Sequence, residues 1–230
     1  MSEQGIAESP IRVGISACVL GQKVRFDGGH KEDRFLTGTL AQFVEFVPVC
    51  PEVEVGMGTP RETVRLVRAE DGGTRMVAPK SDTDHTTSMR RFSKRRVREL
   101  ESLELCGYVL KKGSPSCGME RVKIYDPKGM PQKKGRGLFA EALMDQFPLL
   151  PVEEDGRLND PRLRDNFFVR LFAYRRLKDL FSGRWRVGDL VRFHTAEKLL
   201  LMAHDREGYR QLGKLVADPK SHPRKQLAEE

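Results

Sequence analysis

Three of the four cysteines in this 230-residue chain lie just beyond apolar, strand-like runs. Cys18 and Cys50 each end such a run, and Cys117 follows a third run after a short loop. Because the carboxyl ends of parallel strands share one edge of an open sheet, thiols far apart in sequence can meet there. Three thiolates around one point form a soft-metal site, either for zinc or for an iron–sulfur cluster. The spacing therefore predicts a metal centre.

Groups that can move protons lie beside two of these thiols. Glu52 is two residues from Cys50, and Ser114 is three residues from Cys117, each in a loop that contains a proline. A carboxylate and a hydroxyl next to a metal form the layout needed for proton transfer to a metal-activated substrate. Gly118 is expected to let the backbone approach a bulky ligand closely.

Few other residues are candidates for ligands of the metal. No CxxC pair is present, and no histidine has a spacing from the thiols that would complete a tetrahedral zinc site. Three protein ligands would leave one position open for substrate, which is the pattern of a catalytic site. Cys106 begins a strand instead of ending one, so it is expected at the opposite edge of the sheet in a structural role.

The elements that must position these residues alternate between strand and helix over the first ~155 residues. This order predicts an α/β fold, a Rossmann-like parallel sheet flanked by helices. The strand candidates are Ile11–Ala17, Phe43–Val49, Thr63–Arg68, Gly107–Lys111 and Val122–Tyr125. The helix candidates are Leu36–Gln42, a short helix opened by Thr59-Pro60, His85–Leu103 and Leu138–Phe147.

Two details of these strands carry expectations of their own. The glycines at 72 and 73 predict a hairpin that interrupts the parallel order. Pro48 lacks an amide donor, so its strand is expected to end or bulge there, which would help to aim Cys50.

From Asn159 onward the pattern is helical only, which predicts an all-α C-terminal segment. Asp160 and Pro161 are expected to cap the first helix, and further helices fit Gly188–His204 and Glu207–Val216. We therefore divide the chain into domains at residues 1–155 and 156–230.

The charge is unevenly spread between these two parts. Up to Asp155 there are 24 Lys and Arg against 23 Asp and Glu, whereas from Gly156 onward there are 17 against 10. The second part thus carries +7 of the net +8, which suggests a polyanionic partner such as nucleic acid, with a solvated charged helical surface as the alternative. Arg175 and Arg176 are the candidate RNA contacts, together with the basic stretch 90–96.

No run of eighteen apolar residues and no secretory signal is present, so we expect a cytoplasmic protein that does not enter the membrane. Reducing conditions then direct the cysteines toward metal binding or catalysis. No obligate protein partner is evident.

The cysteine motifs resemble those of the thiouracil desulfidase family over about residues 10–155. The matching stretches are Ser16–Gly21 with Val24–Gly28, Val49–Glu52 and Lys112–Gly118. The resemblance implies a 4Fe–4S cluster held by Cys18, Cys50 and Cys117, whose fourth iron takes the sulfur of a thiolated pyrimidine. It also implies Glu52 as proton donor or water activator and Ser114 as a hydroxyl that orients the substrate.

The C-terminal part is similar to the helical domain fused to this module in many bacterial proteins. The similar stretches are Asp160–Phe167, Phe193–Lys198 and Tyr209–Gly213. Members with that fusion are linked to removal of 4-thiouridine sulfur from tRNA. Because this chain is shorter than such fusions, we expect the helical domain to be incomplete.

The expected function is therefore cluster-dependent removal of sulfur from thiouridine, foremost 4-thiouridine in tRNA, giving uridine and sulfide. Two alternatives stay open. One is a desulfidase of free thiouracil, in which the helical segment serves only packing or dimerisation. The other is a non-catalytic RNA-binding module with a structural metal.

Overall fold

The computed structural model describes residues 10–219 and divides into two compact units, Met1–Phe168 and Val169–Glu230. Strands and helices alternate in the first unit, whereas the described part of the second unit contains helices only. The boundary lies within helix α4 (Pro161–Phe181). The predicted fold class, a parallel α/β sheet flanked by helices with an all-α C-terminal segment, is confirmed.

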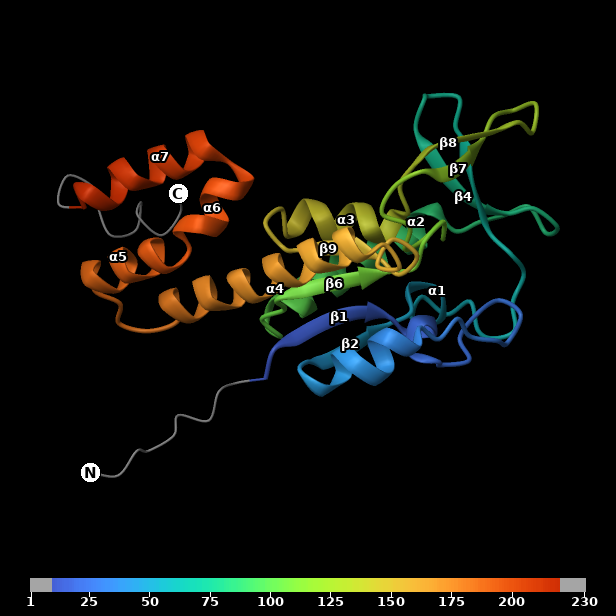
Figure 1. The fold of residues 1–230 in the computed structure, drawn as a ribbon. Helices are drawn as coiled ribbons and strands as arrows, with labels where there is room; N and C mark the ends of the chain where they lie inside the picture. The colour runs from blue at the N-terminus through green and yellow to red at the C-terminus, as the bar shows by residue number, and fades with distance from the viewer. Residues whose placement is uncertain (1–9, 220–230) are drawn as a thin grey trace. The chain divides into compact units, whose positions relative to one another are not determined.

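Sheet A contains four parallel strands in the order β2-β1-β6-β9 (Figure 1). Their bounds are Arg12–Ser16 (β1), Glu45–Val49 (β2), Gly107–Leu110 (β6) and Val152–Glu154 (β9). Ile15 of β1 and Val109 of β6 are fully buried, which is typical of parallel strands covered by helices on both faces. The four carboxyl ends lie along one edge of the sheet because all four strands are parallel.

The expectation that β2 would end or bulge at Pro48 is wrong. Pro48 pairs in regular register with Ile15 of β1, and β2 continues to Val49. The missing amide is tolerated because β2 is an edge strand of sheet A, with only one neighbour to bond. Cys50 follows directly on the last strand residue.

Helices α2 (Thr86–Glu101) and α3 (Leu138–Gln146) lie side by side against sheet A (Figure 1). Phe92 of α2 is buried, and Phe139 of α3 packs its ring 6.0 Å from that of Tyr108 in β6. Both helices agree with the sequence prediction to within three residues at either end. The stretch predicted at Leu36–Gln42 is a π-helical turn at Phe35–Thr39 followed by a 3-10 turn at Leu40–Gln42.

The short helix predicted to open at Thr59 is absent from the described structure. Residues 59–64 contain no helix, and a short helix, α1 (Pro51–Glu54), occurs instead directly after Cys50. Pro51 occupies the first helical position, and two glutamates lie in the first turn, where the helix dipole favours negative charge. A proline at the first helical position therefore occurs at Pro51, and Pro60, where it was predicted, begins no helix.

Sheet B is a second, mixed sheet in the order β5-β4-β3-β7-β8. Its strands are Arg65–Arg68 (β3), Thr74–Ala78 (β4), Thr83–Asp84 (β5), Val122–Tyr125 (β7) and Pro131–Gly135 (β8). The predicted hairpin is confirmed as the antiparallel pair β3–β4. The strand candidates Thr63–Arg68 and Val122–Tyr125 thus belong to this second sheet and not to sheet A, and each contains both buried and exposed residues.

The described part of the second unit continues α4 into three helices, α5 (Val187–Ala196), α6 (Lys198–His204) and α7 (Arg206–Ala217). At the start of α4 the side chain of Asp160 accepts bonds from the amides of Arg162 and Leu163, which confirms the predicted cap. The helix predicted over Gly188–His204 is divided at Glu197, whose buried carboxylate pairs with Arg176.

Among residues 10–219, no helix is long and apolar enough to cross a membrane.

Candidate active site

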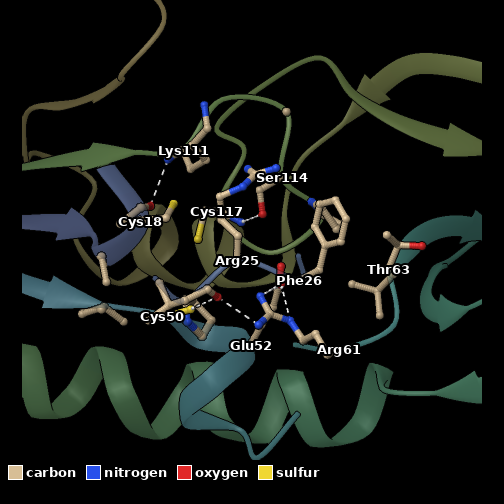
Figure 2. Close-up of a pocket in the computed structure, with 18 of the residues that line it drawn as sticks. Cys18, Arg25, Phe26, Cys50, Glu52, Arg61, Thr63, Lys111, Ser114 and Cys117 are labelled. Atoms are coloured by element: carbon tan, nitrogen blue, oxygen red, sulfur yellow. Dashed lines mark hydrogen bonds and ion pairs between the residues drawn. The ribbon is translucent and has the colours of Figure 1, made fainter. Parts of the chain in front are cut away.

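The three strand-end thiols line a single cavity of about 230 Å³ at the carboxyl edge of sheet A (Figure 2). Cys18 lies in a 3-10 turn, Ala17–Leu20, after β1, and Cys50 lies between β2 and α1. Cys117 lies in the loop that follows β6. The sequence prediction that these thiols meet is therefore confirmed, and their role as metal ligands stays a prediction.

Burial governs the protonation of the three thiols. It raises the pKa of Cys18 to about 11, although the nearby charge of Lys111 partly opposes the shift. Burial also raises the pKa of Cys50, and it raises that of Cys117 well above its ordinary value. Each thiol thus holds its proton strongly until a cation displaces it, and metal binding would release those protons.

The donor set of the cavity fits an iron–sulfur cluster better than a single ion. Within the described residues, no group of three or more His, Cys, Asp and Glu side chains is close enough together to hold one ion. Among residues 10–219, no histidine lines the cavity. A cluster of four irons is larger than one ion, so its thiolate ligands are more widely separated, and cysteine thiolates are its usual ligands.

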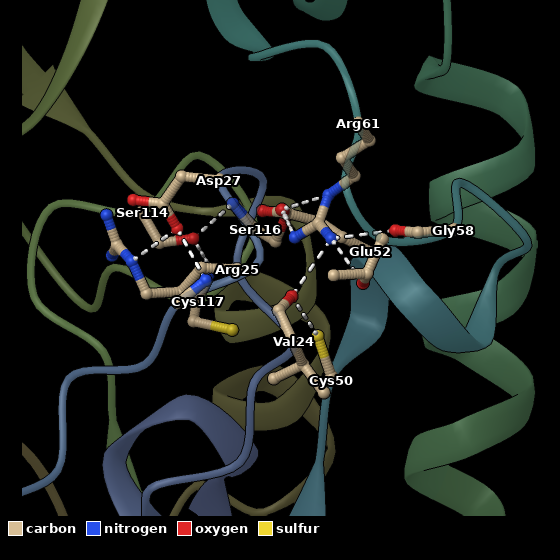
Figure 3. A network of polar contacts seen from close by, with 12 residues as sticks. Val24, Arg25, Asp27, Cys50, Glu52, Gly58, Arg61, Ser114, Ser116 and Cys117 are labelled. Atoms are coloured by element: carbon tan, nitrogen blue, oxygen red, sulfur yellow. Dashed lines mark hydrogen bonds and ion pairs between the residues drawn. The ribbon is translucent and has the colours of Figure 1, made fainter.

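Glu52, in the first turn of α1, also lines the cavity (Figure 3). Its side chain is 14% exposed. One carboxylate oxygen accepts bonds from Nε and Nη2 of Arg61, the first at 3.0 Å, and the other accepts the Ser116 hydroxyl at 2.7 Å. These partners fix the carboxylate in orientation, and the oxygen that accepts the Ser116 hydroxyl keeps a lone pair that a further donor, such as water, can use.

Sequence reasoning missed Arg61, whose side chain is only 6% exposed. Besides Glu52, its guanidinium donates to the carbonyl oxygens of Val24 and Gly58, both at 2.9 Å. Arg61 therefore ties the loop after Cys18 to the helix after Cys50. No local pattern could have revealed it, because the interacting groups come together only in the tertiary structure.

Replacing Arg61 with glutamine should lower the free energy of unfolding by about 3 kcal/mol, because it leaves the Glu52 carboxylate buried without its charged partner. Chemical denaturation at matched metal content measures this loss. Arg61→Lys should restore only part of it, since an ammonium lacks the planar fork that bonds a carboxylate and two carbonyls at once.

The matched control is Arg91→Gln, which removes an exposed arginine of α2 and should change stability by less than about 0.5 kcal/mol. The double variant Glu52→Gln with Arg61→Gln should be less destabilised than the sum of the two single changes, because both buried charges are then absent. Equal losses for Arg61→Gln and Arg91→Gln would contradict this role of Arg61.

Ser114 lines the cavity and also shapes the cysteine loop. Its Oγ accepts bonds from the amides of Ser116 at 3.2 Å and Cys117 at 3.1 Å. Both bonds use the hydroxyl as an acceptor, so its hydrogen remains available to donate to a ligand. The predicted role in orienting the substrate stays a prediction, to which the structure adds a role in holding Cys117.

The reason given above for Gly118 is wrong. A Cβ at this position would lie 2.3 Å from Cγ2 of Val122 and 2.8 Å from the carbonyl oxygen of Ser114. Protein atoms, and not a ligand, therefore require the glycine. The loop is further fixed by α3, where the amides of Phe139 and Ala140 donate to the carbonyl of Ser116 at 3.0 and 3.1 Å.

A second set of contacts that the sequence did not predict lies at the carboxyl edge of sheet A. Nζ of Lys111, beyond β6, lies 2.6 Å from the carboxylate of Asp155, beyond β9, and the amide of Lys112 donates to the same carboxylate at 2.8 Å. The amide of Lys111 also donates to Oγ of Ser16 at 2.9 Å. These bonds connect the ends of three strands around Cys18.

The other predicted residues are not among those that line the cavity. Cys106 is buried just before β6, at the opposite edge of sheet A, as expected. Arg175 and Arg176 lie in the second unit, where each pairs with a carboxylate. Nε of Arg175 lies 2.7 Å from Asp179, and Nε of Arg176 lies 2.6 Å from Glu197.

Comparison with known proteins agrees with this geometry. The model of the 2-thiouracil desulfurase family matches residues 13–155, and a second model, of a family described only as a protein of unknown function (DUF1722), matches residues 198–230. Because the first match spans more than half of the sequence, the chain belongs to the 2-thiouracil desulfurase family.

Three individual proteins are also similar to this chain, each over part of its length. The [4Fe-4S]-dependent thiouracil desulfidase TudS superposes with a TM-score of 0.54 at 28% identity, covering 69% of this chain and 98% of that one. Uncharacterized protein YbbK of Bacillus subtilis (strain 168) is 28% identical over 108 residues, which are 45% of this chain and 71% of YbbK. Uncharacterized protein YbgA of Escherichia coli (strain K12) is 36% identical over 61 residues, which are 26% of this chain and 36% of YbgA.

Proposed function

We propose that this chain is a desulfidase that removes sulfur from a thiolated pyrimidine with the help of a 4Fe–4S cluster held by Cys18, Cys50 and Cys117. The observation that carries the proposal is the meeting of these three thiols in one cavity that Glu52 and Ser114 also line. Membership of the 2-thiouracil desulfurase family and the similarity to TudS, a [4Fe-4S]-dependent thiouracil desulfidase, support it.

The chemistry that such a cluster supplies when bound is Lewis-acid polarisation of the C–S bond at the iron that has no protein ligand. The residues of the chain would manage the proton transfers of the reaction, in which a thiocarbonyl and water give a carbonyl and hydrogen sulfide. Glu52, which lines the cavity, would accept a proton from the water that attacks the ring carbon and return it to the departing sulfur. Ser114 can donate its hydroxyl hydrogen to a polar edge of the ring.

We propose thiouridine within tRNA, foremost 4-thiouridine, as the substrate. The excess positive charge from Gly156 onward supports a nucleic acid. A cavity of about 230 Å³ admits a base and not a duplex, so the thiolated base would leave its stack to enter. In this proposal residues 1–155 form the desulfidase domain and residues 156–230 the basic helical domain, in a cytoplasmic protein whose thiols stay reduced.

Arg175 and Arg176 are proposed as RNA contacts of the helical domain. The side chain of Arg176 is 51% exposed, so it can reach a phosphate while it keeps its bond to Glu197. Arg175 is 14% exposed and pairs with Asp179, so a phosphate would have to share it with that carboxylate. Because both arginines already have acidic partners, reversing their charge would also disturb the helices.

Thiolated tRNA is expected to be turned over with a kcat/KM at least ~10-fold higher than free 4-thiouracil, because contacts far from the base contribute binding energy. This advantage should shrink with added salt, since phosphate contacts are salt-dependent, whereas turnover of the free base should not. Anaerobic assays of both substrates between low and physiological salt measure the difference.

Free thiouracil is the second candidate substrate. It is favoured by the similarity to TudS, a thiouracil desulfidase of which the matched region covers 98%. A kcat/KM for free thiouracil equal to or above that for thiolated tRNA would decide for this alternative.

A further inference from the structure

The outward face of sheet B carries cations that the proposed reaction does not use. Along β3 and β7 the buried residues Leu66 and Ile124 pack inward. Their sequence neighbours Arg65 and Lys123 are exposed, as is Lys133 on β8. Because side chains alternate between the two faces of a strand, these three cations point away from the core.

The register of the strands places the three cations in one row. Lys123 is the direct partner of Lys133 in the antiparallel pair β7–β8. In the parallel pair β3–β7, Leu66 is level with Ile124, so the residues before them, Arg65 and Lys123, are level as well. Neighbouring strands lie about 4.8 Å apart, so three positive charges follow one another across three adjacent strands.

Such a row is unfavourable for folding. Like charges directly opposite each other across a strand pair are destabilising. Within residues 10–219 no carboxylate forms an ion pair with Arg65, Lys123 or Lys133. Arg75 of β4, in contrast, is paired with Asp84 at 2.8 Å. An uncompensated row of this kind is expected where an external anion supplies the missing negative charge.

An aromatic ring accompanies the row. The guanidinium of Arg65 lies 5.1 Å from the centre of the Tyr125 ring, and Tyr125 is only partly buried. Sheets that bind unpaired RNA combine cations for the phosphates with aromatic rings on which bases stack.

The row also begins beside the candidate active site. Thr63 and Val64 line the cavity that contains the three thiols, and β3 starts at the next residue, Arg65 (Figure 2). A strand of RNA that crosses the face of sheet B can therefore continue directly to the cavity.

The basic helix α2 is the weaker candidate, contrary to the expectation from the stretch 90–96. Three of its arginines are neutralised within the fold. Arg90 pairs with Glu141, Arg95 with Glu99, and Arg96 with Glu54 and Glu99.

We propose that the outward face of sheet B docks the phosphate backbone of unpaired RNA, with Arg65, Lys123 and Lys133 contacting phosphates and Tyr125 offering a ring to a base. The proposal rests on the proposed function in taking RNA as the substrate. It names the surface that guides a nucleotide chain to the cavity.

Lys133→Glu should leave folding intact while it weakens RNA binding, so this single variant distinguishes the two effects. It converts a like-charge pair with Lys123 into an opposite-charge pair, so the midpoint of thermal unfolding should rise or stay unchanged. The affinity of the full chain for an unmodified tRNA transcript should nevertheless fall at least ~10-fold. The double variant Lys123→Glu with Lys133→Glu should also lower the slope of log affinity against log salt by about 1.4–1.8, or 0.7–0.9 for each lost contact.

The matched control is Arg34→Glu with Arg98→Glu, two exposed cations outside sheet B and outside the stretch 90–96 that make the same change in net charge. It should alter tRNA affinity less than about twofold. Unchanged affinity in the sheet variants would overturn the docking surface, and so would an equal loss in the control variant. Weakened binding to vesicles containing phosphatidylserine, with tRNA binding intact, would assign the face to a membrane and overturn it as well.

The transcript carries no thiolated base, so this experiment is independent of desulfidation. Transcript binding that depends on Lys123 and Lys133, in a protein that turns over only free thiouracil, would contradict the tRNA substrate and support the docking surface. Turnover of thiolated tRNA with transcript binding unaffected by the lysine variants would contradict the docking surface and support the substrate.

Discussion

Replacing Cys18, Cys50 or Cys117 singly with alanine is expected to abolish both the brown colour of the anaerobically purified protein and its desulfidase activity. Each substitution removes one of the three thiols that line the cavity, and a cluster left with two protein ligands is not retained. Iron and sulfide content, the absorption spectrum and turnover of 4-thiouracil measure the effect. Because metal binding and folding are coupled, circular dichroism should accompany each measurement.

The control is Cys106→Ala, which removes a buried thiol at the opposite edge of sheet A. It should keep the iron, the colour and the activity, although the lost packing costs some stability. Full iron content in any of the three cavity variants would refute the ligand assignment for that residue. Loss of iron in Cys106→Ala without unfolding would show that the fourth thiol had been wrongly excluded.

Glu52→Gln is expected to keep the cluster and to lose at least about a hundredfold in turnover, which is the usual scale of general acid–base catalysis. Glutamine has nearly the same size, and its amide oxygen can still accept a bond from Arg61 or from Ser116. It cannot accept and return a proton as a carboxylate does. Steady-state turnover at equal iron content measures the loss.

Glu54→Gln is the matched control for this variant. Glu54 belongs to the same short helix and accepts a bond from the amide of Cys50 at 2.9 Å, but it does not line the cavity. Its turnover should stay within a few fold of the unmodified protein. If Glu52→Gln instead loses its iron, Glu52 supports the site structurally, and if it keeps full turnover, the proton transfer belongs to another group.

The strand-end cysteines could be predicted because their elements are short, apolar and buried. β1 and β6 are covered on both faces, and such strands are visible in sequence as continuous apolar runs. Their carboxyl ends then place Cys18 and Cys117 at one edge by the geometry of a parallel sheet.

Strands without an apolar run were not predicted from the sequence. β8 has the sequence Pro-Gln-Lys-Lys-Gly, and four of its five residues are exposed at the edge of sheet B. β9 buries two carboxylates, Glu153 and Glu154. Nε of Arg157 binds the first at 2.7 Å, and the amide of Met119 binds the second at 2.9 Å. Met119 is 35 residues from Glu154, so this second partner gives no local signal in the sequence.

The thiols of the candidate site could be predicted from the sequence, whereas the residues that hold Glu52 in place could not. Glu52 is two residues from Cys50 and Ser114 is three residues from Cys117, so their chemistry could be inferred from the sequence alone. The bonds that orient Glu52 come from Arg61 and Ser116, which are 9 and 64 residues away. Such contacts depend on the packing of the whole unit and follow from no motif.

The most direct test of the central claim is a count of iron and acid-labile sulfide in the protein purified without oxygen, together with its absorption spectrum. A three-cysteine cluster site predicts ~4 iron and ~4 sulfide per chain and a broad absorption band that fades on exposure to air. Zinc at about one ion per chain, with neither iron nor sulfide, would contradict the account and favour a structural metal in a non-catalytic RNA-binding module.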